Sequence, residues 1–94
     1  MALKVVWSQR ALRDLEAIAN YISCDSPAYA STVVKNITTR TRTLGQFPQI
    51  GRKVPEFDDE SMRELMEYSY RIIYQVKAEH VLIAAVIHGK RILH

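Results

Sequence analysis

The stretch Tyr70-Arg71-Ile72-Ile73-Tyr74-Gln75-Val76, together with the apolar run at residues 81–87, decides the fold of this chain. In the first segment, apolar and polar residues alternate with a period of two, which predicts a half-buried β-strand with its aromatic residues on one face. The second segment is apolar on both faces, which predicts a central strand of a sheet. Because only a short polar link separates the two segments, we expect them to pair antiparallel.

Two amphipathic helices are predicted upstream of these strands. Ser8 is a candidate N-cap for the first helix, and Ser26 with Pro27 is a candidate start for the second. The apolar residues of each helix recur at steps of three and four, which places them on one face. They are Leu12, Leu15, Ile18, Ala19 and Ile22 in the first helix, and Ala30, Val33, Val34, Ile37, Thr41 and Leu44 in the second. Asp14 is expected to face water, and Gly45 is expected to end the second helix.

The remaining segments complete a sheet. Residues 3–7 and 62–66 are candidate strands, whereas residues 48–60 are predicted to be loop because glycine, proline and acidic residues interrupt any period. The last three strands follow one another by short links, which predicts an antiparallel meander. We therefore predict one two-layer α+β domain over residues 1–94, of order β-α-α-β-β-β, with an αα-hairpin packed on a small, mainly antiparallel sheet. The sequence leaves open which sheet edge the first strand joins.

Composition excludes several classes of protein. Hydrophobic residues make up 48% of the 94-residue chain and charged residues 24%, which is typical of a globular domain with one core. No apolar run approaches the ~20 residues of a membrane span, and no secretory signal is recognisable. The single cysteine, Cys24, cannot form an internal disulfide, which favours a cytosolic protein. The three histidines are not accompanied by other ligand residues at the spacing of a zinc site, so no metal and no other cofactor is expected.

The net charge is +3, but the basic and acidic residues are separated along the sequence. Residues 26–55 contain five basic residues and no acid, whereas residues 56–67 carry six acids and only Arg63 as a base. A basic region of this size suits an anionic partner, either nucleic acid or an acidic protein segment. The alternative is a solvated helix face with basic strand ends.

Three charged residues are candidates for catalysis. Arg71 is expected to project to the face opposite the aromatic residues, where it suits a phosphate or a carboxylate. Alternatively, Arg71 forms a strand-end salt bridge with Glu64 or Glu67 across the hairpin. His88, at the end of the last strand, can act as a general acid or base, or can be structural or merely exposed. Glu56, in the loop, can act as a general base or can simply be solvated.

If Glu56, Arg71 and His88 converge, they form a set for RNA cleavage. The base would take the proton of the ribose 2′-hydroxyl, the arginine would stabilise the charge at phosphorus, and the acid would protonate the leaving 5′-oxygen. This chemistry requires no metal. The chain has no glycine-rich phosphate loop, no Ser/His/Asp arrangement and no dinucleotide fingerprint.

A set of short motifs runs along the whole chain in a fixed order. They are Ala11, Asp14-Leu15, Tyr21-Ile22, Pro48, Gly51-Arg52, Val54-Pro55-Glu56, Arg63-Glu64-Leu65, Tyr70-Arg71-Ile72-Ile73-Tyr74-Gln75-Val76 and His88-Gly89-Lys90-Arg91. This ordered set resembles the RelE/ParE superfamily of bacterial toxins from type II toxin–antitoxin systems. The resemblance implies a small toxin that halts growth until a partner antitoxin wraps it.

The resemblance implies two alternative targets, because fold does not determine function. RelE-like members cut mRNA on the ribosome, whereas ParE-like members poison DNA gyrase without known hydrolytic chemistry of their own. Arg71 and Arg91 match two RelE active-site arginines, but Met62 and Glu64 stand on the strand where RelE has its catalytic lysines. The tyrosine on the C-terminal tail of RelE has no counterpart before His94.

A second ribonuclease branch, which is YoeB-like, uses glutamate, arginine and histidine. Glu56 and Arg71 match those positions, while His88 is near but not in register. If the protein is a ribonuclease, its candidate catalytic residues are therefore Glu56, Arg71, His88 and Arg91. The Gly-Arg, Val-Pro-Glu, Arg-Glu-Leu and Tyr-Arg pattern of ParE-like members fits the chain well. We therefore favour a ParE-like gyrase inhibitor from a plasmid stabilisation module, with a ribosome-associated mRNA endoribonuclease or an inactive antitoxin-binding module as alternatives.

The expected partner is a cognate antitoxin, whose acidic amphipathic segment would lie along the helical hairpin and a free sheet edge. The residues expected to bind this antitoxin or the target are Lys35, Arg40, Arg42, Arg52 and Arg63. A cytoplasmic toxin–antitoxin hetero-oligomer without membrane contact follows from these expectations.

Overall fold

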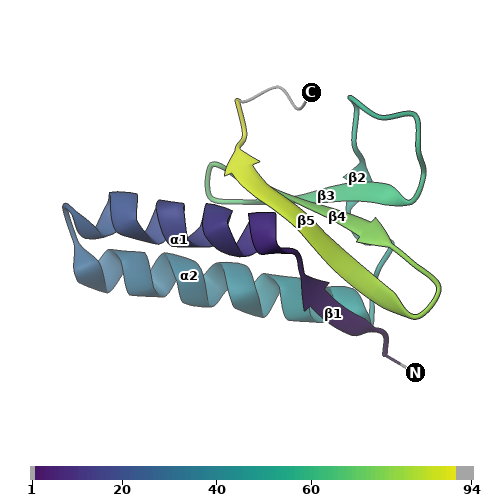
Figure 1. The fold of residues 1–94 in the computed structure, drawn as a ribbon, viewed down its shortest axis with the longest axis horizontal. Coiled ribbons are helices and arrows are strands. Elements are labelled where there is room, and N and C mark those ends of the chain that lie inside the picture. The colour runs from purple at the N-terminus through teal and green to yellow at the C-terminus, as the bar shows by residue number, and fades with distance from the viewer. Residues whose placement is uncertain (1, 91–94) are drawn as a thin grey trace.

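The computed structural model describes residues 2–90 (Figure 1). A pair of helices packs against one face of a five-stranded sheet, so the domain has two layers. The helices are α1 (Gln9–Ser23) and α2 (Pro27–Arg42), and α2 is followed by a 3₁₀ turn, η1 (Thr43–Gly45). The strands are β1 (Lys4–Trp7), β2 (Arg52–Lys53), β3 (Met62–Glu67), β4 (Tyr70–Val76) and β5 (His80–His88).

The sheet has the order β1-β5-β4-β3-β2, in which β1 runs parallel to β5 and the other pairs are antiparallel. The predicted α+β fold class is confirmed, and the first strand joins the sheet beside β5. The prediction that residues 48–60 form only loop was wrong, because Arg52 and Lys53 pair with Glu64 and Arg63 of β3. A strand of two residues is too short to leave a period in the sequence.

The first turn of α1 is fixed to β5. Ser8 is the N-cap, as predicted: its Oγ accepts the N–H of Ala11 at 3.0 Å and donates to a carbonyl of β5 at 3.0 Å. These contacts orient α1 so that Ala11 is buried and Leu12 is 53% exposed. The prediction that Leu12 belongs to the buried apolar face of this helix was therefore wrong. Asp14 was wrongly expected only to face water, because its carboxylate accepts the N–H of Val86 at 2.9 Å.

The second helix begins as predicted, with the Ser26 hydroxyl accepting the N–H of Tyr29 at 3.1 Å and Pro27 in the first turn. Its buried residues are Ala30, Val33, Ile37 and Thr41. The helix ends at Arg42, before Gly45, and Gly45 does not adopt the left-handed conformation. A Cβ at Gly45 would lie 2.6 Å from the carbonyl oxygen of Leu3, so this glycine allows β1 to approach η1 closely.

Apolar residues cover both faces of the sheet. On the helix side, β4 and β5 contribute Ile72, Tyr74, Val81, Ile83 and Val86 to the main core. On the outer side, Val54 and Phe57 from the loop between β2 and β3 pack against Ile73, Ala85 and Ile87. This loop therefore covers part of the face that the helices leave open, and it brings Glu56 over β4.

Candidate functional site

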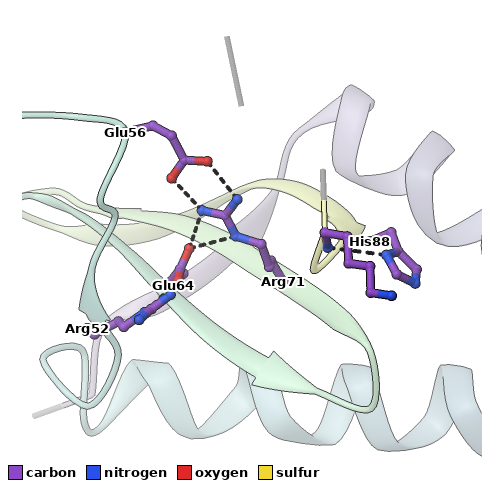
Figure 2. Close-up of polar contacts among 6 residues, drawn as sticks. Arg52, Glu56, Glu64, Arg71 and His88 are labelled. Atoms are coloured by element: carbon purple, nitrogen blue, oxygen red, sulfur yellow. Dashed lines mark hydrogen bonds and ion pairs between the residues drawn. The ribbon is translucent and has the colours of Figure 1, made fainter. Parts of the chain in front are cut away.

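Arg71 is the centre of a charged network on the outer face of the sheet, as Figure 2 shows. Its Nη1 and Nη2 donate to the two carboxylate oxygens of Glu56, each at 2.7 Å. Its Nε donates to Oε1 of Glu64 at 2.8 Å. The residue is only 5% exposed, so its guanidinium is enclosed by two carboxylates and largely shielded from water.

Glu64 extends this network to a second arginine. Its side chain, on β3, is fully buried, and its other oxygen, Oε2, accepts from Nε and Nη2 of Arg52 at 2.6 Å. Arg52 lies opposite Glu64 on β2, and its side chain remains 67% exposed. The four residues Glu56, Arg71, Glu64 and Arg52 thus form a continuous chain of ion pairs with no net charge.

This pairing offsets the cost of burying the charges. Transfer of a lone carboxylate or guanidinium out of water is strongly unfavourable, and hydrogen bonds to a partner of opposite charge compensate for it. The hydrogen bonds that Arg71 donates to Glu56 raise the pKa of Arg71 above its ordinary value, as do those that it donates to Glu64, while burial acts in the opposite direction. Arg71 therefore remains charged, and a phosphate that approached it would have to displace a carboxylate.

The local sequence explains how Glu56 reaches Arg71. Val54 is fully buried, and its N–H donates to the carbonyl of Met62 at 3.2 Å. A tight turn follows, in which the N–H of Phe57 donates to the carbonyl of Val54 at 3.2 Å. Val54 and Phe57 pack on the outer face of the sheet, so the glutamate between them lies above Arg71.

His88 does not join this network. It pairs with Tyr70 in the register of β4 and β5, one residue out of phase with Arg71, and so lies on the helix side of the sheet. Its ring meets that of Tyr70 edge to face at 6.1 Å, and its Nδ1 accepts the N–H of Lys90 at 3.2 Å. The structure thus brings Glu56 and Arg71 together and places His88 on the other face; Arg91 lies outside the described residues.

The five basic candidates lie in different surroundings. Arg52 belongs to the network, while Arg40 lies 3.6 Å from the carboxylate of Glu67. Nη1 of Arg63 donates to the carbonyl of Gly51 at 2.9 Å and helps to hold the start of β2. Lys35 and Arg42 are exposed on α2. The basic region is therefore partly neutralised within the protein and partly open to a partner.

Sequence reasoning missed an aromatic groove on the helix side. Tyr21, Tyr29, Tyr68 and Tyr70 contribute to its lining together with His88, and the groove has a volume of about 540 Å³. Tyr68, in the turn between β3 and β4, has a positive φ of 56° and meets Tyr29 edge to face at 6.3 Å. Four of the five tyrosines of the chain line this groove, whereas Tyr74 lies in the main core. The number of tyrosines was a signal in the sequence, but the convergence of these four depends on the tertiary fold.

Residues 2–90 contain neither a cluster of metal-ligating side chains nor a helix that could span a membrane. No three histidine, cysteine, aspartate or glutamate side chains gather there as a metal site would require. Neither described helix is both long and apolar enough to cross a membrane.

A helical hairpin packs on a mixed five-stranded sheet, and the Arg52, Glu56 and Arg71 side chains of the quoted motifs lie at its outer face; solved structures of the RelE/ParE class of toxins share this fold. Residues 5–93 match the family model described as the ParE toxin of the type II toxin–antitoxin system parDE, and the chain therefore belongs to this family. It is the toxin component of a type II toxin–antitoxin system.

Individual relatives carry both superfamily names. Toxin RelE2 of Caulobacter vibrioides is 34% identical over 90 residues, which cover 95% of this chain and 98% of the relative. The fold is similar to the chromosomal ParDE system from P. aeruginosa, with a TM-score of 0.77 and 22% identity over 95% of this chain and 98% of that one. It is also similar to a mutant of E. coli toxin RelE in the free state, with a TM-score of 0.68 and 21% identity over 96% and 86% of the two chains.

Proposed function

We propose that this toxin arrests growth by poisoning DNA gyrase and not by cutting mRNA. The closed network around Arg71 carries the proposal. Both carboxylate oxygens of Glu56 accept from Arg71, and the remaining face of the guanidinium is occupied by Glu64. The match of residues 5–93 to the ParE family model agrees with this choice.

Cleavage of RNA needs groups that the described residues do not offer together. A general base must be free to accept a proton, and a cation must be open to the phosphate. Within residues 2–90, the candidate base Glu56 and the candidate cation Arg71 neutralise each other, and His88 lies across the sheet from both. ParE-like inhibition needs no such set, because it depends on binding a protein target.

An mRNA endoribonuclease is the second candidate. The proximity of Glu56 and Arg71, together with the similarity to RelE2, favours it. In that case binding on the ribosome would have to open the ion pair. An inactive module that only binds the antitoxin is the third candidate, and growth arrest on expression without the antitoxin would eliminate it.

Two assays on purified, antitoxin-free toxin separate the first two candidates. We expect inhibition of gyrase in a DNA supercoiling assay and no cuts in ribosome-bound mRNA. Cuts in the mRNA without any effect on supercoiling would overturn the proposal in favour of the ribonuclease. Both targets lie in the cytoplasm, where we infer that the toxin acts.

We also propose that an acidic amphipathic segment of the cognate antitoxin lies along the helical hairpin and neutralises the toxin as a hetero-oligomer. Lys35 and Arg42 support this surface, because both are exposed on α2. Charge reversal at both positions should weaken antitoxin binding severalfold and reduce its salt dependence. Lys77→Glu, in the turn between β4 and β5, is the matched control. Equal affinities for both variants would place the antitoxin elsewhere.

A further inference from the structure

Two large apolar side chains are exposed on the 47–50 turn, the segment of residues 47–50 that links η1 to β2. Phe47 is 59% exposed and Ile50 is 53% exposed. With Pro48 between them, they border a shallow hollow of about 420 Å³. Neighbouring exposed apolar side chains of this size are typical of a contact surface, because their hydration is unfavourable in the free protein.

Hydrogen bonds fix the backbone of this turn. The N–H of Ile50 donates to the carbonyl of Phe47 at 3.1 Å, and the N–H of Phe47 donates to η1 at 2.9 Å. From inside the core, the hydroxyl of Tyr74 donates to the carbonyl of Pro48 and accepts the N–H of Gly51, both at 2.8 Å. The apolar side chains are therefore displayed on a rigid support, which lowers the entropy lost when a partner binds them.

The charges around the turn are basic. Arg42 precedes it, and Arg52 and Lys53 follow it; all three residues are exposed. Residues 26–55 contain no acid, although Arg52 shares its charge with Glu64 and Lys53 lies 3.4 Å from Asp58. A partner that buries Phe47 and Ile50 is therefore favoured if its rim is acidic.

The shape of the surface favours a folded partner. The aromatic groove lined by Tyr21 and Tyr29 lies near the start of α2, whereas the 47–50 turn follows its end, and the groove is concave, so it can receive an extended or helical segment. The 47–50 turn instead presents anchors that need a pocket in the partner, and a folded protein supplies one.

We propose that the 47–50 turn inserts Phe47 and Ile50 into an acidic-rimmed apolar pocket on the folded protein that the toxin inhibits. The identity of that protein as gyrase rests on the function proposed above. The antitoxin does not need Phe47 and Ile50, because the surface proposed for it above lies along the helical hairpin.

The test compares the double variant Phe47→Ser, Ile50→Ser with Leu12→Ser, whose side chain is 53% exposed on α1. Gyrase inhibition, growth arrest, antitoxin affinity and melting temperature are measured for both and for the wild type. We expect the double variant to need at least about tenfold more protein to inhibit supercoiling. Its antitoxin affinity should match that of the wild type.

Unchanged inhibition by the double variant would overturn the proposal, as would a loss of antitoxin affinity that accompanies the loss of inhibition. If the wild type does not inhibit gyrase, the proposed function fails and growth arrest becomes the readout for the turn. Arrest by Leu12→Ser but not by the double variant would then support the surface, whereas arrest by both would overturn it. If the double variant does not fold, Ile50→Ser alone carries the same comparison.

Discussion

The two faces of β4 are built on different principles. Towards the helices the strand presents Ile72 and Tyr74, which are fully buried among apolar side chains. Towards the outside it presents Arg71, which is buried among carboxylates. The helix side depends on shape and apolar area, so it can absorb small changes of volume. The outer side depends on complete pairing of charges, because the loss of one member leaves a buried charge with fewer hydrogen bonds than it has in the intact network.

The largest effect should follow from removal of the central charge. Arg71→Ala leaves the fully buried Glu64 with Arg52 as its remaining ion-pair partner, and deprives Glu56 of its bidentate contact. We expect a loss of about 3–5 kcal/mol in the free energy of unfolding, measured by urea denaturation. Alanine at this position is therefore a poor probe of catalysis, since loss of activity would accompany loss of structure. A loss below about 1 kcal/mol would contradict a structural role for the network.

A smaller effect is expected at Tyr74, whose ring packs in the main core and whose hydroxyl contacts the 47–50 turn. Tyr74→Phe keeps the buried ring but removes the hydroxyl that contacts Pro48 and Gly51. The buried N–H of Gly51 then lacks its partner, so we expect a loss of about 1–3 kcal/mol on urea denaturation. The amide of Gly51 should also exchange its hydrogen faster. Unaltered exchange there would mean that Tyr74 does not hold the 47–50 turn.

The junction between α1 and β5 should show a still smaller effect. Ser8→Ala removes the N-cap of α1 and one contact to a carbonyl of β5. We expect a loss of about 1 kcal/mol, measured by the same denaturation. Ser23→Ala, near the other end of the helix, is the control, because the Ser23 hydroxyl donates only to a carbonyl of its own helix. Equal losses in the free energy of unfolding for the two variants would show that the Ser8 cap does not stabilise the contact between α1 and the sheet.

Alkaline pH should weaken the fold slightly through Tyr74. Burial raises the pKa of Tyr74 above its ordinary value of 10.0, although the N–H of Gly51 and the charge of Arg63 oppose this. The unfolded chain therefore loses the tyrosine proton first. The associated stability is present below pH 10 and is lost as the pH rises through the pKa of the folded state. Melting curves above pH 10 should decline less for Tyr74→Phe than for the wild type, and parallel declines would contradict this assignment.

The sequence predicted the helix side of the molecule better than the outer side. Periods of two and of three to four mark β4 and the helices because those elements bury one continuous apolar face. The pairing of Arg71 with Glu64 was one of the alternatives, but the additional contact with Glu56 depends on how a loop folds over the sheet. The position of His88 across from Arg71 follows from the register of β4 and β5, which periodicity does not fix.

The most direct test of the central claim is growth arrest by the Glu56→Gln variant. Glutamine keeps an oxygen that can accept from Arg71 but cannot serve as a general base, and the Glu56 side chain is 20% exposed, so the fold should tolerate the change. If the network is structural and the toxin acts by binding, the variant will arrest growth at the same expression level as the wild type. A variant that folds and binds its antitoxin but no longer arrests growth would contradict the account.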